Sequence, residues 1–277
     1  MNASEPHRAT PATPAIRSAR AAAVAAVALA SVVLIVVAQN VIVGAGLARH
    51  DAANLGFFID HRTPMLVTAA KVVTNLGGAP FLVLVAVVAG GLLWRSGSRL
   101  AVAVAPGVAL VVAGAAAALG KGVVGRGRPP ASLHLVTETA ASFPSGHATD
   151  SAALYLTIGL LLAATVVRRP LARVVFVVIA GVLVAAVGAS RLVLGVHWPT
   201  DVLAGWALGA LVAVTVTTAA LLAARPGGDD PSARQTKPGH GWPTVRRILT
   251  TTRHAPAGHE IESRQIVAPA SHQRGQD

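Results

Sequence analysis

The 277-residue chain is 53% hydrophobic and 12% charged, about half the charged fraction of an ordinary soluble domain, so its composition argues against a soluble enzyme. It has no cysteine, which excludes disulfide bonds and thiolate metal sites. The net charge is +12, but the basic residues lie between hydrophobic runs and in the C-terminal tail. That distribution is typical of a membrane protein and argues against nucleic-acid binding.

Six stretches of the chain are apolar enough to cross a membrane as helices. A helix rises 1.5 Å per residue and needs about 20 residues to cross roughly 30 Å of hydrocarbon, and the shorter stretches can borrow flanking residues. In chain order, the predicted spans are 21–50, 72–94, 100–120, 151–167, 174–190 and 202–224. The sequence therefore predicts an all-α, polytopic membrane protein with six transmembrane helices in a bundle.

Three regions are predicted along the chain. Residues 1–20 form an N-terminal segment and residues 21–224 form the membrane domain. A cleaved signal peptide is the alternative for the first span, but its apolar stretch is longer than the usual ~7–15 residues. Residues 225–277 are rich in Pro, Gly, Ser, Thr, His and Arg, so we expect a disordered basic tail. A short interfacial helix is expected at 64–74.

The distribution of Lys and Arg predicts the orientation of the spans in the cell membrane. Sixteen of these residues lie in the N-terminal segment, in the turns 95–99 and 168–173, and in the tail, which the topology places on one side. Only seven lie on the other side. Since basic residues are retained in the cytoplasm, both termini are predicted to be cytoplasmic.

Three polar clusters lie on the opposite, outer side, which should be poor in cations. The first, 121–129, begins where the third span ends, and the second, 143–147, precedes the fourth. The third combines 190–191, at the end of the fifth span, with 197–201, at the start of the sixth. Because these span ends share one membrane face, we expect the three clusters to meet.

The clusters contain the groups that a phosphate site needs. A phosphate carries up to two negative charges, and its transfer from water to a site beside hydrocarbon is costly unless cations and N–H donors replace the water. Lys121, Arg128 and Arg191 supply cations. Ser145 supplies a hydroxyl, and Gly146 lies at a helix start, where free N–H groups attract anions.

Two histidines supply reacting groups. Asp201 lies four residues after His197, so its carboxylate could keep one ring nitrogen protonated and leave the other free to attack phosphorus. The product of that attack would be a phosphohistidine. His147, when protonated, can give a proton to the departing lipid alkoxide and later take one from water. The other histidines have no metal-ligand spacing, and no metal or cofactor is predicted.

These clusters resemble the motifs of the type 2 phosphatidic acid phosphatase superfamily, which includes membrane lipid phosphatases and vanadium haloperoxidases. Residues 121–129 fit Lys, six residues, then Arg-Pro, and residues 144–147 fit Pro-Ser-Gly-His. Residues 190–201 fit Ser-Arg, five residues, His, three residues, Asp. Arg126 and Asp150 add charges to this pattern. The resemblance implies an all-helical phosphatase core with its site between spans three to six.

The resemblance also implies a role for each motif residue. His197 is the nucleophile, Asp201 is its partner and His147 is the acid and base. Phosphate is held by Lys121, Arg128, Ser145, Gly146 and Arg191. The family works without a metal ion, so the resemblance implies neither metal nor cofactor.

The sequence thus predicts a metal-independent phosphatase that hydrolyses a lipid phosphate or lipid pyrophosphate at the outer membrane face. Phosphatidate, phosphatidylglycerophosphate and polyprenyl pyrophosphate are the candidate substrate classes. The expected partners are this lipid and membrane lipids, and the oligomeric state stays open.

Three alternative functions are weighed against hydrolysis. A lipid phosphotransferase needs the same site and differs only in its acceptor. An anion transporter is less favoured, because its cations should lie at mid-helix rather than at helix ends. Vanadate-dependent haloperoxidases share the anion pocket but are soluble, so six spans argue against them.

Overall fold

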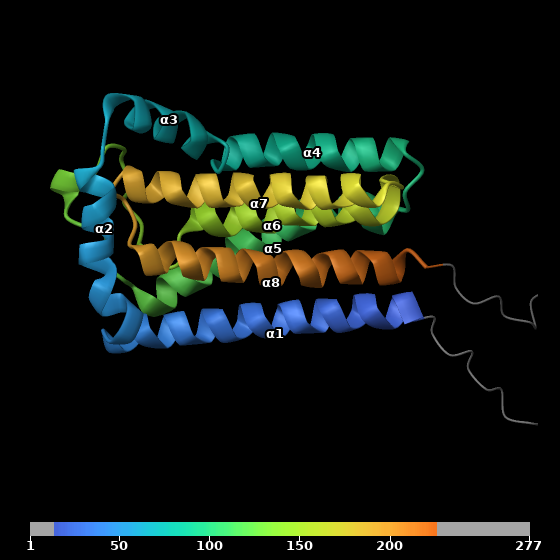
Figure 1. Cartoon of the computed structure of the whole chain (residues 1–277), viewed down its shortest axis with the longest axis horizontal. Helices are drawn as coiled ribbons and strands as arrows, with labels where there is room; N and C mark the ends of the chain where they lie inside the picture. The colour runs from blue at the N-terminus through green and yellow to red at the C-terminus, as the bar shows by residue number, and fades with distance from the viewer. Residues whose placement is uncertain (1–13, 226–277) are drawn as a thin grey trace, which may run out of the picture. The chain divides into compact units, whose positions relative to one another are not determined.

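The computed structural model describes residues 14–225, which form a bundle of helices (Figure 1). The helices are α1 Pro14–Val43, α2 Asp51–Asp60, α3 Pro64–Asn75, α4 Ala79–Arg95, α5 Leu100–Val124, α6 Gly146–Leu161, α7 Pro170–Val193 and α8 Pro199–Ala223. Three short helical turns join them, η1 Gly46–His50, η2 Ala131–Leu133 and η3 Leu162–Val166. The predicted tail beyond residue 225 and the first 13 residues of the predicted N-terminal segment lie outside the described residues.

Five helices of the described part are long and apolar enough to cross a membrane: α1, α5, α6 with η3, α7 and α8. A sixth candidate span consists of α3 and α4, which are bent by 52° at the break between them. The predicted all-α, polytopic fold is therefore confirmed, with five or six candidate spans among the described residues, but the second span differs from the expectation. Residues 72–75 end α3, which also contains the predicted interfacial helix, and only α4 continues the span.

The chain is closely packed at the break between α3 and α4. A Cβ atom added to Gly77 would lie 2.4 Å from Val187 Cγ1 and 3.3 Å from His147 Cδ2. The chain therefore passes close to α6 and α7 at a point where only glycine fits. Pro80 follows in the first turn of α4, where its missing N–H has no helical partner to lose. This break places the end of α3 beside the predicted site residues.

Helices α6 and α8 approach each other closely through glycines of α8. A Cβ atom added to Gly209 would lie 2.4 Å from Thr149 O and 2.6 Å from Ala152 Cβ. One added to Gly205 would lie 2.8 Å from Ser145 O. Small residues allow membrane helices to pack backbone against backbone. This packing fixes the distance between the site residues at the start of α6 and those at the start of α8.

We expect Gly209→Ala to destabilise the protein by about 1–3 kcal/mol, because the new methyl group overlaps helix backbone that cannot rotate away. The matched control is Gly181→Ala in α7, where an added Cβ meets no atom within 4 Å. The measurement is the midpoint of thermal unfolding in detergent. A lower midpoint is expected for Gly209→Ala alone, and equal midpoints for the two variants would contradict the close packing.

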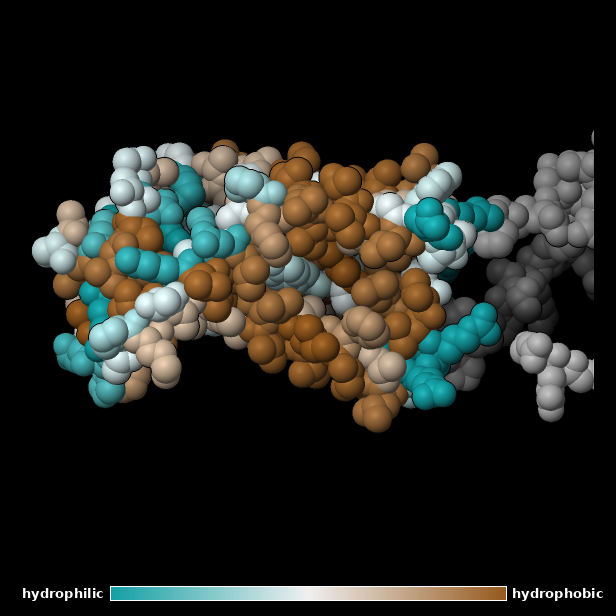
Figure 2. Space-filling view, turned by 90° about the horizontal axis from the view of Figure 1, so that it is seen from above, coloured by the Kyte–Doolittle hydropathy of each residue, from teal (hydrophilic) through white to brown (hydrophobic). Residues whose placement is uncertain are grey.

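The surface of the described residues has an apolar belt. Figure 2 shows hydrophobic side chains over the middle of the bundle and hydrophilic side chains near its two ends. Large apolar side chains are exposed in this belt, among them Val87 at 68% and Val111 at 72%. In water such a continuous apolar surface would promote association. In a bilayer it contacts lipid tails.

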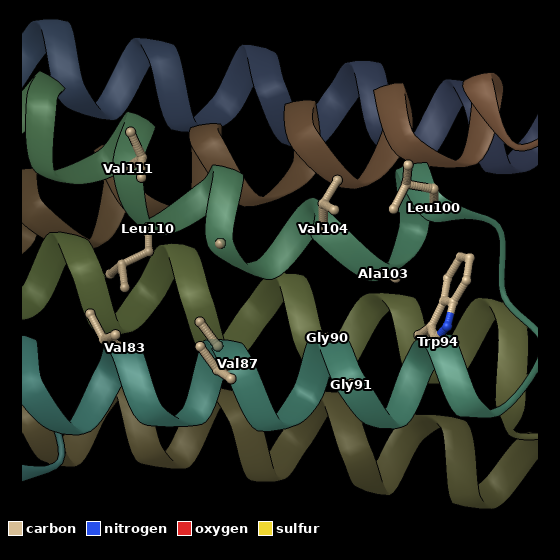
Figure 3. A pocket seen from close by; sticks show the side chains of 12 residues that line it. Val83, Val87, Gly90, Gly91, Trp94, Leu100, Ala103, Val104, Leu110 and Val111 are labelled. Carbon is tan, nitrogen blue, oxygen red and sulfur yellow. The ribbon is translucent and has the colours of Figure 1, made fainter.

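A groove of about 580 Å³ lies in this belt between α4 and α5 (Figure 3). Its lining is apolar, with Val83, Val87 and Val104 among the side chains that border it. Gly90 and Gly91 leave space on the α4 side. No ionisable side chain lines the groove, so it lacks the groups that phosphate chemistry requires.

The candidate chemistry lies instead at one end of the bundle. The ends of α5 and α7 and the starts of α6 and α8 lie at this end, and α2 crosses it (Figure 1, left). The start of α1 and the end of α8 lie at the opposite end (Figure 1, right). The predicted convergence of the three polar clusters on one face is therefore present in the structure.

Candidate active site

The connection between α5 and α6, residues 125–145, brings the first cluster over the end of the bundle; we call it the α5–α6 loop. Gly125 ends α5 with a left-handed φ of +59°, and its N–H donates to Lys121 O at 3.0 Å. This is a common glycine cap of a helix C-terminus. The loop returns through Ser142, whose N–H donates to Arg126 O at 2.9 Å. Lys121 Nζ donates to Ala141 O at 2.6 Å.

His197 lies just before α8, and its side chain is 2% exposed. Its Nδ1 is 3.4 Å from Asp201 Oδ2, and its Nε2 is 3.1 Å from Arg128 Nη1. Since a guanidinium can only donate, the contact with Arg128 assigns the ring proton to Nδ1, facing Asp201. The lone pair of Nε2 therefore points toward the Arg128 guanidinium. The expected pairing of His197 with Asp201 is present, although His197 precedes the helix.

The protonation state of His197 suits a nucleophile. Burial lowers the pKa of His197 to about 4, although the hydrogen bond and charge of Asp201 act in the opposite direction. The positive charges of Arg128 and Arg191 lower it further. The imidazole is therefore neutral at pH 7, and its Nε2 lone pair is available for bond formation.

Glu138, which the sequence analysis did not select, bridges two predicted phosphate ligands. Its Oε1 pairs with Arg191 Nη2, and its Oε2 lies 3.3 Å from Arg128 Nη2. Burial raises the pKa of Glu138, but the Arg191 and Arg128 guanidinium groups outweigh burial, so the pKa is lowered overall and the carboxylate is ionised. One signal could have identified it: Glu138 is the only acidic residue between Asp60 and Asp150.

Two predicted phosphate ligands have polar atoms without a protein partner. Arg191 is 2% exposed and donates from Nη1 to Thr74 Oγ1 at 2.6 Å, but its Nε is buried and unpaired. Ser145 Oγ is likewise buried without a partner, and Ser145 precedes Gly146, the first residue of α6. Buried polar atoms are nearly always hydrogen-bonded. An oxygen-rich anion at this point would supply the missing acceptors.

His147 and Lys121 complete the predicted set. His147 is the second residue of α6, and the charges of Arg191, Glu138, His197 and Arg128 all act on it. Lys121 lies in the last turn of α5, where the charges of Arg128, Asp201 and Glu138 act on it. Direct contacts therefore join Arg128, His197 and Asp201, and Glu138 links Arg191 to them.

Asp150, the extra carboxylate noted in the sequence, makes no hydrogen bond to His147 in the part of the chain that the structure describes, and its Oδ1 is buried without a partner.

Two further residues were not given a role by the sequence analysis. Arg126 binds Asp201 and Asp51 through its two terminal nitrogens, each at 2.6 Å. Asp51 opens α2 and is 2% exposed. Within residues 14–225, no group of three His, Cys, Asp or Glu side chains is arranged to hold a metal ion.

Comparison with known proteins gives consistent similarities. The family model of the PAP2 superfamily matches residues 102–223. Phosphatidylglycerophosphatase B of Bacillus subtilis is 42% identical over 78 residues, which cover 28% of this chain and 38% of that protein. The decaprenylphosphoryl-5-phosphoribose phosphatase of Mycolicibacterium smegmatis is 38% identical over 147 residues, 51% of this chain and 72% of that protein.

A solved structure agrees with these matches. The crystal structure of a transmembrane PAP2-type phosphatidylglycerolphosphate phosphatase from Bacillus subtilis superposes with a TM-score of 0.63 at 27% identity. The match covers 69% of this chain and 94% of that one. The sequence match to the Bacillus subtilis relative spans well under half of that relative's length, at 38%.

Proposed function

Because the chain belongs to the PAP2 superfamily and is a multi-pass membrane protein, we propose that it is a lipid phosphatase that uses His197 as its nucleophile. The observation that supports this most directly is the surroundings of His197 Nε2. A neutral imidazole nitrogen faces Arg128, and the nearby Ser145 and Arg191 have buried polar atoms with no partner. Such a site suits a tetrahedral anion that lies within reach of a nucleophile.

The proposed first step forms a bond between His197 Nε2 and phosphorus. The bond between phosphorus and the lipid oxygen breaks, and His147 donates a proton to the departing oxygen. Asp201 stabilises the positive charge that develops on the imidazole. Arg128, Arg191 and Lys121 stabilise the charge on the phosphoryl oxygens, as do the free N–H groups at the start of α6.

In the second step, water attacks the phosphorus of the phosphohistidine. His147, now neutral, takes a proton from the water, and the bond between Nε2 and phosphorus breaks. The products are inorganic phosphate and a lipid alcohol, or a lipid monophosphate when the substrate is a pyrophosphate. No group of the described residues is consumed, so the enzyme returns to its starting state.

The proposed domain is residues 21–224, with the site at the outer face and both termini in the cytoplasm. The charge distribution supports this orientation. The end of the bundle opposite the site contains the α4–α5 turn with Arg95 and Arg99, and the η3–α7 turn with Arg168, Arg169 and Arg173. Basic residues concentrate at the cytoplasmic ends of spans. In this arrangement a lipid can reach the site sideways at headgroup depth.

The substrate class is a phosphate monoester or pyrophosphate carried by a membrane lipid. Support comes from the relatives, whose names specify phosphatidylglycerophosphate and decaprenylphosphoryl-5-phosphoribose. The test is phosphate release by detergent-purified protein from phosphatidate, phosphatidylglycerophosphate and undecaprenyl pyrophosphate, with EDTA present. We expect release from at least one lipid. Failure on the whole panel, or loss of activity on adding EDTA, would contradict the proposal, and transfer of phosphate to a lipid without release would indicate a phosphotransferase.

Glu138→Gln is expected to tighten inhibition by inorganic phosphate. The carboxylate pairs with Arg128 and Arg191, so a phosphate must displace it or share these guanidinium groups with it. Removing its charge while keeping its shape should lower the inhibition constant by about tenfold, the size of one charge-assisted hydrogen bond. The control is Glu138→Asp, which keeps the charge and should differ less from the wild type. Weaker inhibition in Glu138→Gln would show that the carboxylate supports anion binding rather than competing with it.

A further inference from the structure

Arg126 has a different set of contacts from Arg128, although only one residue separates them. Its Nη1 donates to Asp201 Oδ1 at 2.6 Å and to Thr200 Oγ1 at 2.8 Å. Its Nη2 donates to Asp51 Oδ2 at 2.6 Å. Both terminal nitrogens are thus engaged by protein oxygens, and two carboxylates neutralise its charge. The positive charge of this guanidinium is therefore not available to bind a phosphate.

Asp51 connects the start of α2 to the start of α8. Its Oδ1 accepts from the backbone N–H of Thr200 at 3.0 Å, and its Oδ2 accepts from Thr200 Oγ1 at 2.5 Å. The N–H of Thr200 belongs to the first turn of α8, where backbone donors have no partner within the helix. The Asp51 carboxylate, from a distant segment, therefore caps the start of α8 through Thr200, and Arg126 joins this cap to Asp201.

The two oxygens of Asp201 face different partners as a result. Oδ1 is held by Arg126, whereas Oδ2 accepts from Trp198 N at 2.9 Å and lies 3.4 Å from His197 Nδ1. The Trp198 ring lies 5.6 Å from the Arg126 guanidinium, and its Nε1 donates to Gly127 O at 2.9 Å. These contacts fix the rotation of the carboxylate. Without Arg126, Oδ1 would lose its strongest partner and the carboxylate could turn away from His197.

We infer that Arg126, supported by Asp51, is a positioning residue that holds the Asp201 carboxylate against the His197 ring. The inference deepens the proposed function, because it assigns a role at the same site. Within residues 14–225, the Arg126 side chain makes no hydrogen bond or ion pair with His197 or with the proposed phosphate ligands. Its effect reaches the reacting nitrogen only through Asp201.

The contact between Arg126 and Asp201 affects the pKa of His197. The charged or titratable groups that act on the ring are Asp201 from α8, Arg191 from α7, His147 from α6, and Arg128 and Glu138 from the α5–α6 loop. The hydrogen bond and the negative charge of Asp201 favour the protonated imidazole, so they raise the pKa of His197 against the effect of burial. When Arg126 no longer holds the carboxylate against the ring, this contribution weakens. Arg126→Gln should therefore lower the pKa of His197, in the same direction as Asp201→Asn.

The kinetic test compares Arg126→Gln with Arg128→Gln on the lipid that the wild type hydrolyses. We expect Arg126→Gln to lower kcat about 100-fold, the usual cost of a small misplacement of reacting groups, with KM changed by less than about twofold. In the profile of kcat/KM against pH, the acidic limb of Arg126→Gln should move to lower pH. Arg128→Gln should instead raise KM. Arg126→Lys can bind one carboxylate but cannot bridge both, so it should recover part of kcat.

A second measurement separates this inference from the proposed function. The titration of His197 can be followed by NMR in detergent with labelled histidine, assigned by the signal that is lost in His197→Ala. It needs no substrate, so it applies even if the lipid panel gives no activity. An unchanged or higher His197 pKa in Arg126→Gln overturns the inference, as does a KM increase like that of Arg128→Gln. If Arg126→Gln does not fold, the same titration in Arg126→Lys and Asp51→Asn decides, with a smaller fall in the His197 pKa expected in each.

Discussion

His197→Ala is expected to abolish turnover and the phosphoenzyme together. The imidazole Nε2 is the atom that would bond to phosphorus, and no neighbouring side chain among the described residues can replace it in the same position. Removing a covalent nucleophile typically lowers kcat by on the order of 10⁵–10⁶-fold. The measurement is a single turnover with ³²P-labelled lipid, quenched in alkali and followed by gel separation of the labelled protein.

The control for this experiment is His61→Ala. His61 is exposed at the end of α2, where its Nδ1 lies 2.8 Å from Phe57 O, and it has no contact with the site. This variant should keep both the label and the activity. Label that persists in His197→Ala would show that another residue is the nucleophile, even if turnover were lost.

His147→Ala is expected to slow hydrolysis by an amount that depends on the leaving group. A lipid alkoxide has a high pKa and needs a proton as it departs, whereas an activated aryl phosphate does not. Loss of a general acid typically lowers the rate by about 10²–10⁴-fold, so we expect hydrolysis of the lipid substrate to slow by a factor in this range. The first step with nitrophenyl phosphate should be far less affected. The phosphoenzyme should then accumulate, because its hydrolysis also needs His147.

The comparison variant for His147→Ala is Asp201→Asn. It disturbs His197, which attacks phosphorus whatever the leaving group, so both substrates should slow by similar factors. Rates of phosphoenzyme formation and decay, measured separately by rapid quench, distinguish the two patterns. If His147→Ala slowed the hydrolysis of both substrates equally, His147 would not be the general acid.

The positions of the spans follow from the sequence because the bilayer imposes a simple requirement on length and polarity. Five predicted spans appear as single helices, with ends shifted by several residues, as α1 and α7 illustrate. The second is divided at Gly77, where a side chain would overlap Val187. This close approach brings together residues over a hundred positions apart, which hydropathy does not report.

The meeting of the three motifs at one end of the bundle also follows from the sequence, since alternate span ends share a face. The catalytic and phosphate-binding roles assigned to the motif residues are still predictions. Glu138 was missed for a different reason. A single carboxylate in a polar loop has no periodicity or spacing, and only its partners, Arg128 and Arg191, reveal its place.

The sequence by itself determined the fold class and the end of the bundle at which the predicted phosphate ligands gather. These depend on apolar length and on residue type, which are local properties. Only the tertiary structure decided which cation binds which anion. Arg126 and Arg128 are equivalent in composition, yet Arg126 holds Asp51 and Asp201, each 75 residues away in sequence, and Arg128 contacts His197. Hydrogen bonds depend on distances of a few ångströms between remote segments, and the packing of the helices together with the path of the α5–α6 loop sets those distances.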